Sequence, residues 1–166
     1  MNPVIIKPRV EHTEAIAAIC ANGWKQTVNG KLSEEYQNKN IDFWYSHDKV
    51  SHDIREGNYT HAALFENKIA GVIGGGITKP GRCEVFVLYV DENQRYQGIG
   101  SLLLDALTEQ QLEQGATEQW VSVQEGNQFG IPFYEARGFS FKQRKVSITE
   151  TDEERVSLRY SRFIGT

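Results

Sequence analysis

Residues 83–115 read CEVFVLYVDENQRYQGIGSLLLDALTEQQLEQG, and they carry the strongest structural signal in the chain. The segment opens with a nearly continuous apolar run, which predicts a central β-strand over Cys83 to Val90 with both faces buried. It continues with apolar residues three and four positions apart, which predicts a helix over Gly98 to Gln114 that Gly115 ends. The residues expected on the buried stripe of this helix are Ile99, Leu102, Leu103, Ala106, Leu107 and Gln110.

Weaker patterns on either side of this unit predict further strands and helices. Expected strands lie at Val4 to Val10, Thr60 to Glu66, Ile69 to Thr78, Glu118 to Gln124, Phe139 to Ile148 and Arg155 to Ser161. Expected helices begin near Thr13, Ser33 and Ile131. Pro8 makes the first strand an edge strand, and Gly23 is expected to end or kink the first helix. This order predicts an α/β fold with a mixed central β-sheet flanked by helices.

Length and charge exclude several classes of protein. With 166 residues and 18.9 kDa, the chain is expected to form one domain over residues 1–166. A net charge of −4 without a basic patch argues against nucleic-acid binding. The apolar runs are shorter than the roughly 20 residues of a membrane-spanning helix, so no membrane partner is expected.

The two cysteines, Cys20 and Cys83, lie far apart inside apolar stretches, which favours free buried thiols over a disulfide. The N-terminal residues lack the pattern of a signal peptide. Together these features favour a cytoplasmic location.

The turn between the central strand and its helix contains Gly98 and Gly100, preceded by Arg95. Glycines let a backbone approach a ligand closely, and a helix N-terminus presents unpaired amides to phosphate. A tight turn without a ligand is the alternative. Leu103 stands where a dinucleotide fold would have its third glycine, and the lysine of a P-loop is absent.

The turn resembles the pyrophosphate-binding signature of the GCN5-related N-acetyltransferase (GNAT) family, Gln/Arg-x-x-Gly-x-Gly/Ala. Downstream, Asn127 and the run from Phe133 to Phe139 resemble that family's Asn followed by Phe-Tyr-x-x-x-Gly-Phe. Gly130 departs from the family by replacing a frequent alanine, and Pro132 follows it. We therefore expect the short helix to begin late, near Gly130 or Ile131.

The resemblance implies an acyl-CoA N-acyltransferase fold and an enzyme that transfers the acetyl group of acetyl-CoA directly to a primary amine in a ternary complex. Asn127 would lie near the pantetheine or thioester. The other residues implied to bind the cofactor are Leu88, Tyr89, Val90, Arg95, Tyr96, Gln97, Gly98, Ile99, Gly100 and Ser101. A backbone amide near Leu88 or Tyr89 would meet the oxyanion.

Two side chains are candidates for proton transfer. Glu84 stands where the resemblance places a general-base glutamate, and it would take a proton from the amine. The alternative is a carboxylate paired with Arg82 or another cation. Tyr134 would protonate the departing CoA thiolate, because a phenol and a thiol have similar pKa values. Its alternative role is that of a core aromatic.

Other features carry less chemistry. The four histidines lack the spacing of a metal site, so no metal is expected, and Cys83 lacks a partner that would make it a nucleophile. The resemblance implies that residues 22–58 shape the acceptor pocket, where the aromatic residues are Trp24, Tyr36, Phe43, Trp44 and Tyr45 and the acidic ones are Glu34, Glu35, Asp42, Asp48 and Asp53. The alternative role of these aromatic residues is in the core.

The identity of the acceptor stays open, and it can be a small-molecule or a protein amine. Alternative functions are transfer of a longer acyl group, a non-catalytic acyl-CoA-binding or regulatory module, and a structural interaction domain. A homodimer is possible, because apolar faces on the last strands can pair two chains.

Overall fold

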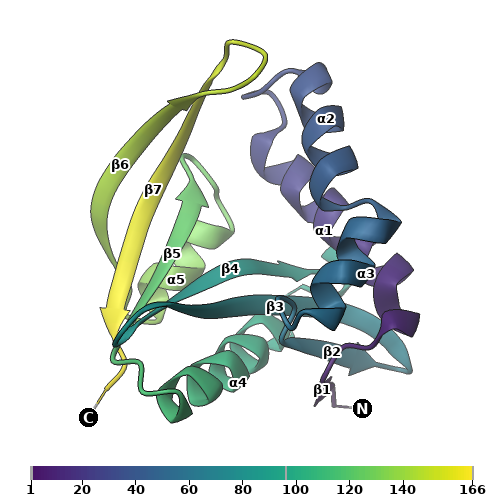
Figure 1. The fold of residues 1–166 in the computed structure, drawn as a ribbon, viewed down its shortest axis with the longest axis vertical. Coiled ribbons are helices and arrows are strands. Elements are labelled where there is room, and N and C mark those ends of the chain that lie inside the picture. The colour runs from purple at the N-terminus through teal and green to yellow at the C-terminus, as the bar shows by residue number, and fades with distance from the viewer. Residues whose placement is uncertain (1, 96, 166) are drawn as a thin grey trace.

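The computed structural model describes residues 2–95 and 97–165 (Figure 1). In chain order, the elements are β1 (Val4–Ile6), η1 (Val10–His12), α1 (Thr13–Val28), α2 (Glu34–Trp44), α3 (His47–Arg55), β2 (His61–Phe65), β3 (Lys68–Lys79), β4 (Arg82–Val90), η2 (Glu92–Gln94), α4 (Ile99–Glu113), β5 (Glu118–Gln124), α5 (Gly130–Ala136), β6 (Ser140–Ile148) and β7 (Glu154–Phe163). The η elements are single turns of 3-10 helix.

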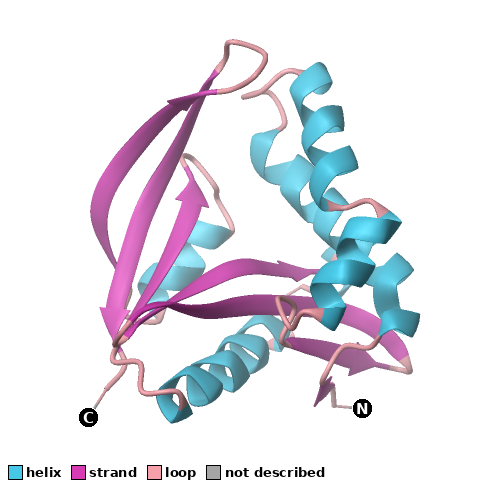
Figure 2. Ribbon diagram, viewed as in Figure 1, coloured by secondary structure: helices cyan, strands magenta, loops and turns pink. Residues whose placement is uncertain are grey.

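The strands form one mixed sheet in the order β1-β2-β3-β4-β5-β7-β6. Only β4 and β5 run parallel, and every other neighbouring pair is antiparallel. Figure 2 shows α1, α2 and α3 on one face of the sheet and α4 on the other. The predicted mixed sheet flanked by helices is therefore confirmed, and β1 is an edge strand as expected.

Apolar clusters pack the helices onto both faces of the sheet. Leu103, Leu104 and Leu107 of α4 pack with Ile73 and Val85 of the sheet. On the other face, α1 and α3 enclose a second cluster that contains Ile16, Cys20, Val50 and Val72. Burial of such side chains stabilises the fold by about 1.5–3 kcal/mol each.

Helix α4 was predicted with the right bounds but with an imperfect buried face. Leu102 is 41% exposed, whereas Leu104 and Gln111 are buried. Gln111 is buried because its amide donates to the backbone carbonyl of Glu84, at 3.1 Å, and accepts from Gln119, at 2.8 Å. Apolar spacing alone does not reveal such a buried glutamine.

In the N-terminal half, the structure corrects three predictions made from the sequence. Helix α1 runs through Gly23 without ending there. The missing side chain makes room for Tyr89, because a Cβ atom at position 23 would lie 2.3 Å from its ring. The first strand ends at Ile6, before Pro8. Helix α3 was not predicted, although Ser46 caps it by accepting from the amide of Lys49, at 3.2 Å.

The central strand β4 is not buried on both faces as predicted. Cys83 and Val85 are buried, but Phe86 is 54% exposed and the residues after it are half-buried. The reason is that β5 pairs with β4 only over Arg82–Val85 and then diverges. The apolar run beyond Val85 therefore lines an opening in the sheet.

Candidate active site

The divergence of β4 and β5 creates a cleft of about 950 Å³ between them. In Figure 1, β5, β6 and β7 rise away from the plane of β1–β4, and α1 and α2 stand opposite them. Beyond Val85, the edge of β4 that faces the cleft has no partner on β5. Its backbone groups are therefore available to a ligand.

The cleft opens on both faces of the sheet. We call the part formed with α4 and α5 the α4 side; its residues include Arg95, Gly98, Ile99, Gly100, Ser101, Asn127, Phe133, Tyr134 and Arg137. We call the part formed with the first three helices the α1–α3 side; its residues include Trp24, Trp44, Tyr45, Lys49, Asp53, Asn58, Tyr59, Arg155 and Ser157.

The α1–α2 loop and the β6–β7 loop are joined by hydrogen bonds between Ser33 and Glu153, neither of which lines the cleft. The backbone amide and the hydroxyl of Ser33 both donate to the carboxylate of Glu153, each at 2.6 Å. These hydrogen bonds hold the pKa of Glu153 below its usual value. Segments 120 residues apart are therefore joined here.

The turn before α4 lies between the predicted strand and helix, and its backbone conformation suits glycine. Gly98 has a φ of +78°, in the left-handed region that favours glycine. The first backbone hydrogen bond of α4 runs from the amide of Leu102 to the carbonyl of Gly98, at 3.1 Å. The amides before Leu102 thus sit at the positive end of the helix dipole, in the wall of the cleft.

Most of the residues expected to bind the cofactor line this cleft. Those found there are Leu88, Tyr89, Val90, Arg95, Gly98, Ile99, Gly100, Ser101 and Asn127. Gln97 does not line it, and its amide donates to Gln94 instead, at 3.0 Å. Tyr96 lies outside the described residues.

Two arginines flank the glycine turn. Arg95 donates to the side-chain carbonyl of Gln26 and stacks on Phe129, with 4.2 Å from guanidinium carbon to ring centroid. Arg137 donates to the hydroxyl of Ser101, at 3.0 Å from Nε, and stacks on Phe133 at 3.8 Å. Sequence reasoning missed Arg137, because only the return of α5 onto α4 brings it to the turn.

Asn127 has a structural role as well as a place in the cleft. Its side-chain oxygen accepts from the amides of Phe129 and Gly130, at 3.0 and 2.9 Å, and so satisfies the beginning of α5. A Cβ atom on Gly130 would lie 2.7 Å from the Asn127 amide nitrogen. Glycine at position 130 is therefore compatible with this cap, and α5 begins there as predicted.

Tyr134 is buried in the wall on the α4 side, with its ring edge-on to Phe133 and Phe139. Burial raises the pKa of its hydroxyl above the usual value of 10. The hydroxyl therefore stays protonated at neutral pH, but it is a weaker acid than the expected match with a thiol requires, so the proton-donor role stays a prediction.

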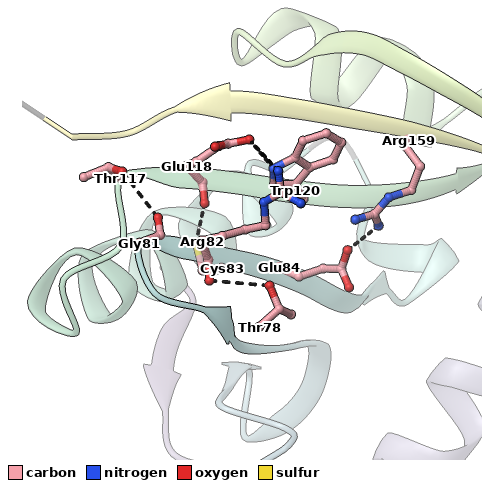
Figure 3. Close-up of polar contacts among 9 residues, drawn as sticks. All are labelled: Thr78, Gly81, Arg82, Cys83, Glu84, Thr117, Glu118, Trp120 and Arg159. Carbon is pink, nitrogen blue, oxygen red and sulfur yellow. Dashed lines mark hydrogen bonds and ion pairs between the residues drawn. The ribbon is translucent and has the colours of Figure 1, made fainter.

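Glu84 lies beside the cleft and is not among the residues that line it. Figure 3 shows its carboxylate and the guanidinium of Arg159 pointing toward one another, next to the ring of Trp120. Arg159 also donates to the hydroxyl of Ser122, at 2.8 Å, and Ser122 does line the cleft. The alternative role, a carboxylate paired with a cation, is thus present, and the base role stays a prediction.

Only some of the aromatic and acidic residues of segment 22–58 line the α1–α3 side of the cleft. Trp24, Trp44 and Tyr45 line the cleft, whereas Tyr36 and Phe43 do not. Asp53 is the only one of the predicted acidic residues that lines it, and the other four are exposed elsewhere. Acidic residues are therefore not concentrated at the site.

Three further predictions concern the cysteines, a membrane span and a metal site. Cys20 and Cys83 are free and buried, as predicted, and burial raises the pKa of each thiol, to about 12 and about 11. Within residues 2–95 and 97–165, no helix has the length and apolar character needed to cross a membrane. In the same part of the chain, no three His, Cys, Asp or Glu side chains are grouped to hold a metal ion.

Comparisons with known proteins agree with this geometry. Residues 22–139 match the model of the acetyltransferase (GNAT) family. Among curated protein sequences, none matches the chain. Among solved structures, the PaiA N-acetyltransferase of Thermoplasma acidophilum in complex with coenzyme A is 25% identical, with a TM-score of 0.76 over 95% of this chain and 98% of that one.

Two further structures share the fold at lower identity. A GCN5-related N-acetyltransferase from Rhodopseudomonas palustris is 20% identical, with a TM-score of 0.79 over 98% of this chain and 96% of that one. A ribosomal-protein-alanine N-acetyltransferase from Brucella melitensis is also 20% identical, with a TM-score of 0.71 over 96% and 99% of the two chains.

Proposed function

Because the chain belongs to the acetyltransferase (GNAT) family, we propose that it binds acetyl-CoA in the cleft and transfers the acetyl group to a primary amine in a ternary complex, with residues 1–166 acting as one catalytic unit. The observation that carries this proposal is the cleft itself. It joins a helix N-terminus that suits a phosphate on one face of the sheet to an aromatic-lined opening on the other, through a gap between two strands.

The residues of the α4 side fit coenzyme A. Helix-terminal amides and two arginines suit a pyrophosphate, which needs both hydrogen-bond donors and positive charge. The half-buried side chains of Leu88 and Val90, and the unpaired edge of β4, suit a pantetheine arm with its amides and methylene groups. The coenzyme A complex of the relative from Thermoplasma acidophilum supports the same ligand.

Acetyl transfer forms a C–N bond and breaks the C–S bond of the thioester. The nitrogen lone pair attacks the carbonyl carbon, and an amide of β4 near Leu88 or Tyr89 stabilises the oxyanion. The leaving thiolate takes the proton of the Tyr134 hydroxyl, and the acceptor nitrogen gives up a proton through water toward Glu84. Tyr134 then regains a proton from solvent, and Glu84 releases to solvent the proton that it accepted.

Two measurements together test this function. Thermal unfolding should shift with acetyl-CoA and CoA but not with NAD, since a ligand at about 100 times its dissociation constant adds roughly 2.7 kcal/mol to stability. Release of free CoA thiol should then depend on an added amine. A shift without thiol release for any amine would instead favour a non-catalytic acyl-CoA-binding module, and no shift would overturn cofactor binding.

A further inference from the structure

The charges that line the cleft are mostly positive. Asp53 is the only carboxylate among the described lining residues, against Lys49, Arg95, Arg137 and Arg155. Asp53 is also neutralised within the protein, because it lies 3.1 Å from the ammonium of Lys49 and accepts from the amide of Asn58, at 3.3 Å. The cleft therefore offers an incoming polycation no free negative group from these residues.

Arg155 is the cation of the α1–α3 side that is left without such compensation. It is half-buried at the start of β7 and donates to the hydroxyl of Tyr36, at 3.1 Å. Its guanidinium lies 5.9 Å from the ring centroid of Trp24. Among the described residues, no carboxylate lies within 4.0 Å of it.

A half-buried guanidinium held by a phenol and an aromatic ring keeps several N–H donors free for a ligand. Arginine pairs with carboxylates through two parallel hydrogen bonds, which makes it more selective than a point charge. Because Arg155 lines the cleft on the face opposite the glycine turn, an anion bound there would belong to the acceptor and not to coenzyme A.

We infer that the acceptor is an amino carboxylate, a small primary amine whose carboxylate binds Arg155 and whose apolar side chain lies against Trp24, Trp44 and Tyr45. This inference rests on the proposed function, since it names the substrate class of the same site. The inference disfavours polyamines, because a polycation would need acidic residues in the cleft. The acidic residues Glu34, Glu35, Asp42 and Asp48 of segment 22–58 are exposed and do not line it.

The first test uses the unmodified protein and pairs of amines that differ only in the carboxylate. The standard amino acids that carry a primary amine are compared with their amides and with decarboxylated partners such as phenethylamine and tryptamine, and with spermidine, by CoA thiol release. We expect at least one apolar amino acid to exceed both partners about 10-fold or more in kcat/KM. A higher kcat/KM for the amide, for the decarboxylated amine or for spermidine would overturn the inference.

The second test uses Arg155→Gln, with Arg155→Lys as the conservative variant and Arg144→Gln as the matched control. Arg144 lies on β6, pairs with Glu125 at 2.7 Å and does not line the cleft. Arg155→Gln should raise KM for the amino acid roughly 10- to 100-fold while leaving KM for its amide unchanged. Arg155→Lys should restore part of the loss, and Arg144→Gln should change neither value.

Equal losses for the acid and the amide in Arg155→Gln would mean that Arg155 only supports the fold, and the inference would fail. The thermal shift with CoA separates this result from a failure of the proposed function. If CoA stabilises the protein but neither amino acids nor other amines cause thiol release, the proposed transferase function is wrong.

Discussion

The two sides of the cleft are built in different ways. The α4 side takes its helix N-terminus from one contiguous stretch, Gly98 to Ser101, and it relies on backbone amides and glycines. The α1–α3 side is assembled from three helices and the start of β7, and it relies on side chains. A ligand-binding turn can thus be encoded locally, whereas a specificity pocket depends on contacts between distant segments.

The largest effect is expected at Tyr134, in the wall of the α4 side. Tyr134→Phe removes the proton donor while keeping the ring in its aromatic contacts, so kcat should fall about 100-fold or more with CoA affinity unchanged. Steady-state kinetics and CoA titration by calorimetry separate the two quantities. Tyr160→Phe, at another buried tyrosine that does not line the cleft, should keep its activity. Equal activity of both variants would assign Tyr134 to the core.

The next largest effect is expected at Gly98, and it tests whether the α4 side depends on backbone geometry. Gly98→Ala and Gly115→Ala place a side chain at φ values of +78° and +89°, with open space around each added Cβ atom. Each should lose about 1–2 kcal/mol of stability in urea unfolding. Only Gly98→Ala should also weaken CoA binding, by about 10-fold, since Gly115 ends α4 outside the cleft. Equal CoA affinity in both variants would refute the role of the turn.

A similar but side-chain-based effect is expected at Arg137. Arg137→Gln should weaken CoA about 10-fold, because a charged contact to a phosphate is lost. The KM for the acceptor should stay the same, opposite to Arg155→Gln. Titrations in low and high salt provide the check, since the weakening should shrink as salt screens the charge. A change in the KM for the acceptor alone would show that Arg137 contacts the acceptor and not CoA.

A smaller effect is expected at Asn127, which caps α5. Asn127→Ala should lower stability by about 1 kcal/mol, whereas Asn127→Asp should retain most of it because the carboxylate can accept the same two amide hydrogen bonds. Thermal unfolding without ligand measures both. Unchanged stability in the alanine variant would show that the cap is dispensable.

At neutral pH, the smallest effect is expected from the two thiols. Burial raises their pKa values from 9.0 to about 12 for Cys20 and about 11 for Cys83, so the folded state holds these protons more tightly than the unfolded state. Their contribution to stability should be fully present below about pH 9 and be lost as the pH rises toward 11–12. Unfolding monitored from pH 7 to 11 tests this, and rising stability above pH 9 would contradict it.

Features set by neighbouring residues could be predicted from the sequence, whereas features set by contacts between distant residues could not. The bounds of α4 and its glycine turn were predictable, because apolar periodicity and a left-handed glycine are properties of neighbouring residues. The buried face of α4 was less predictable, since Gln111 is buried through hydrogen bonds to β4 and β5 that no periodicity reveals. Helix α3 has a capping serine at Ser46, a signal that was available and was missed.

By itself, the sequence determined the strand, the glycine turn and the helix at the centre of the molecule, together with the acetyltransferase resemblance that they support. Only the tertiary structure decided where β5 leaves β4, that Arg137 returns to the turn and that Glu84 meets Arg159. The physical reason is that hydrogen bonding within a helix or turn depends on adjacent residues. The charge and shape of a pocket depend instead on side chains that packing brings together across the whole chain, as it does for Trp24 and Arg155.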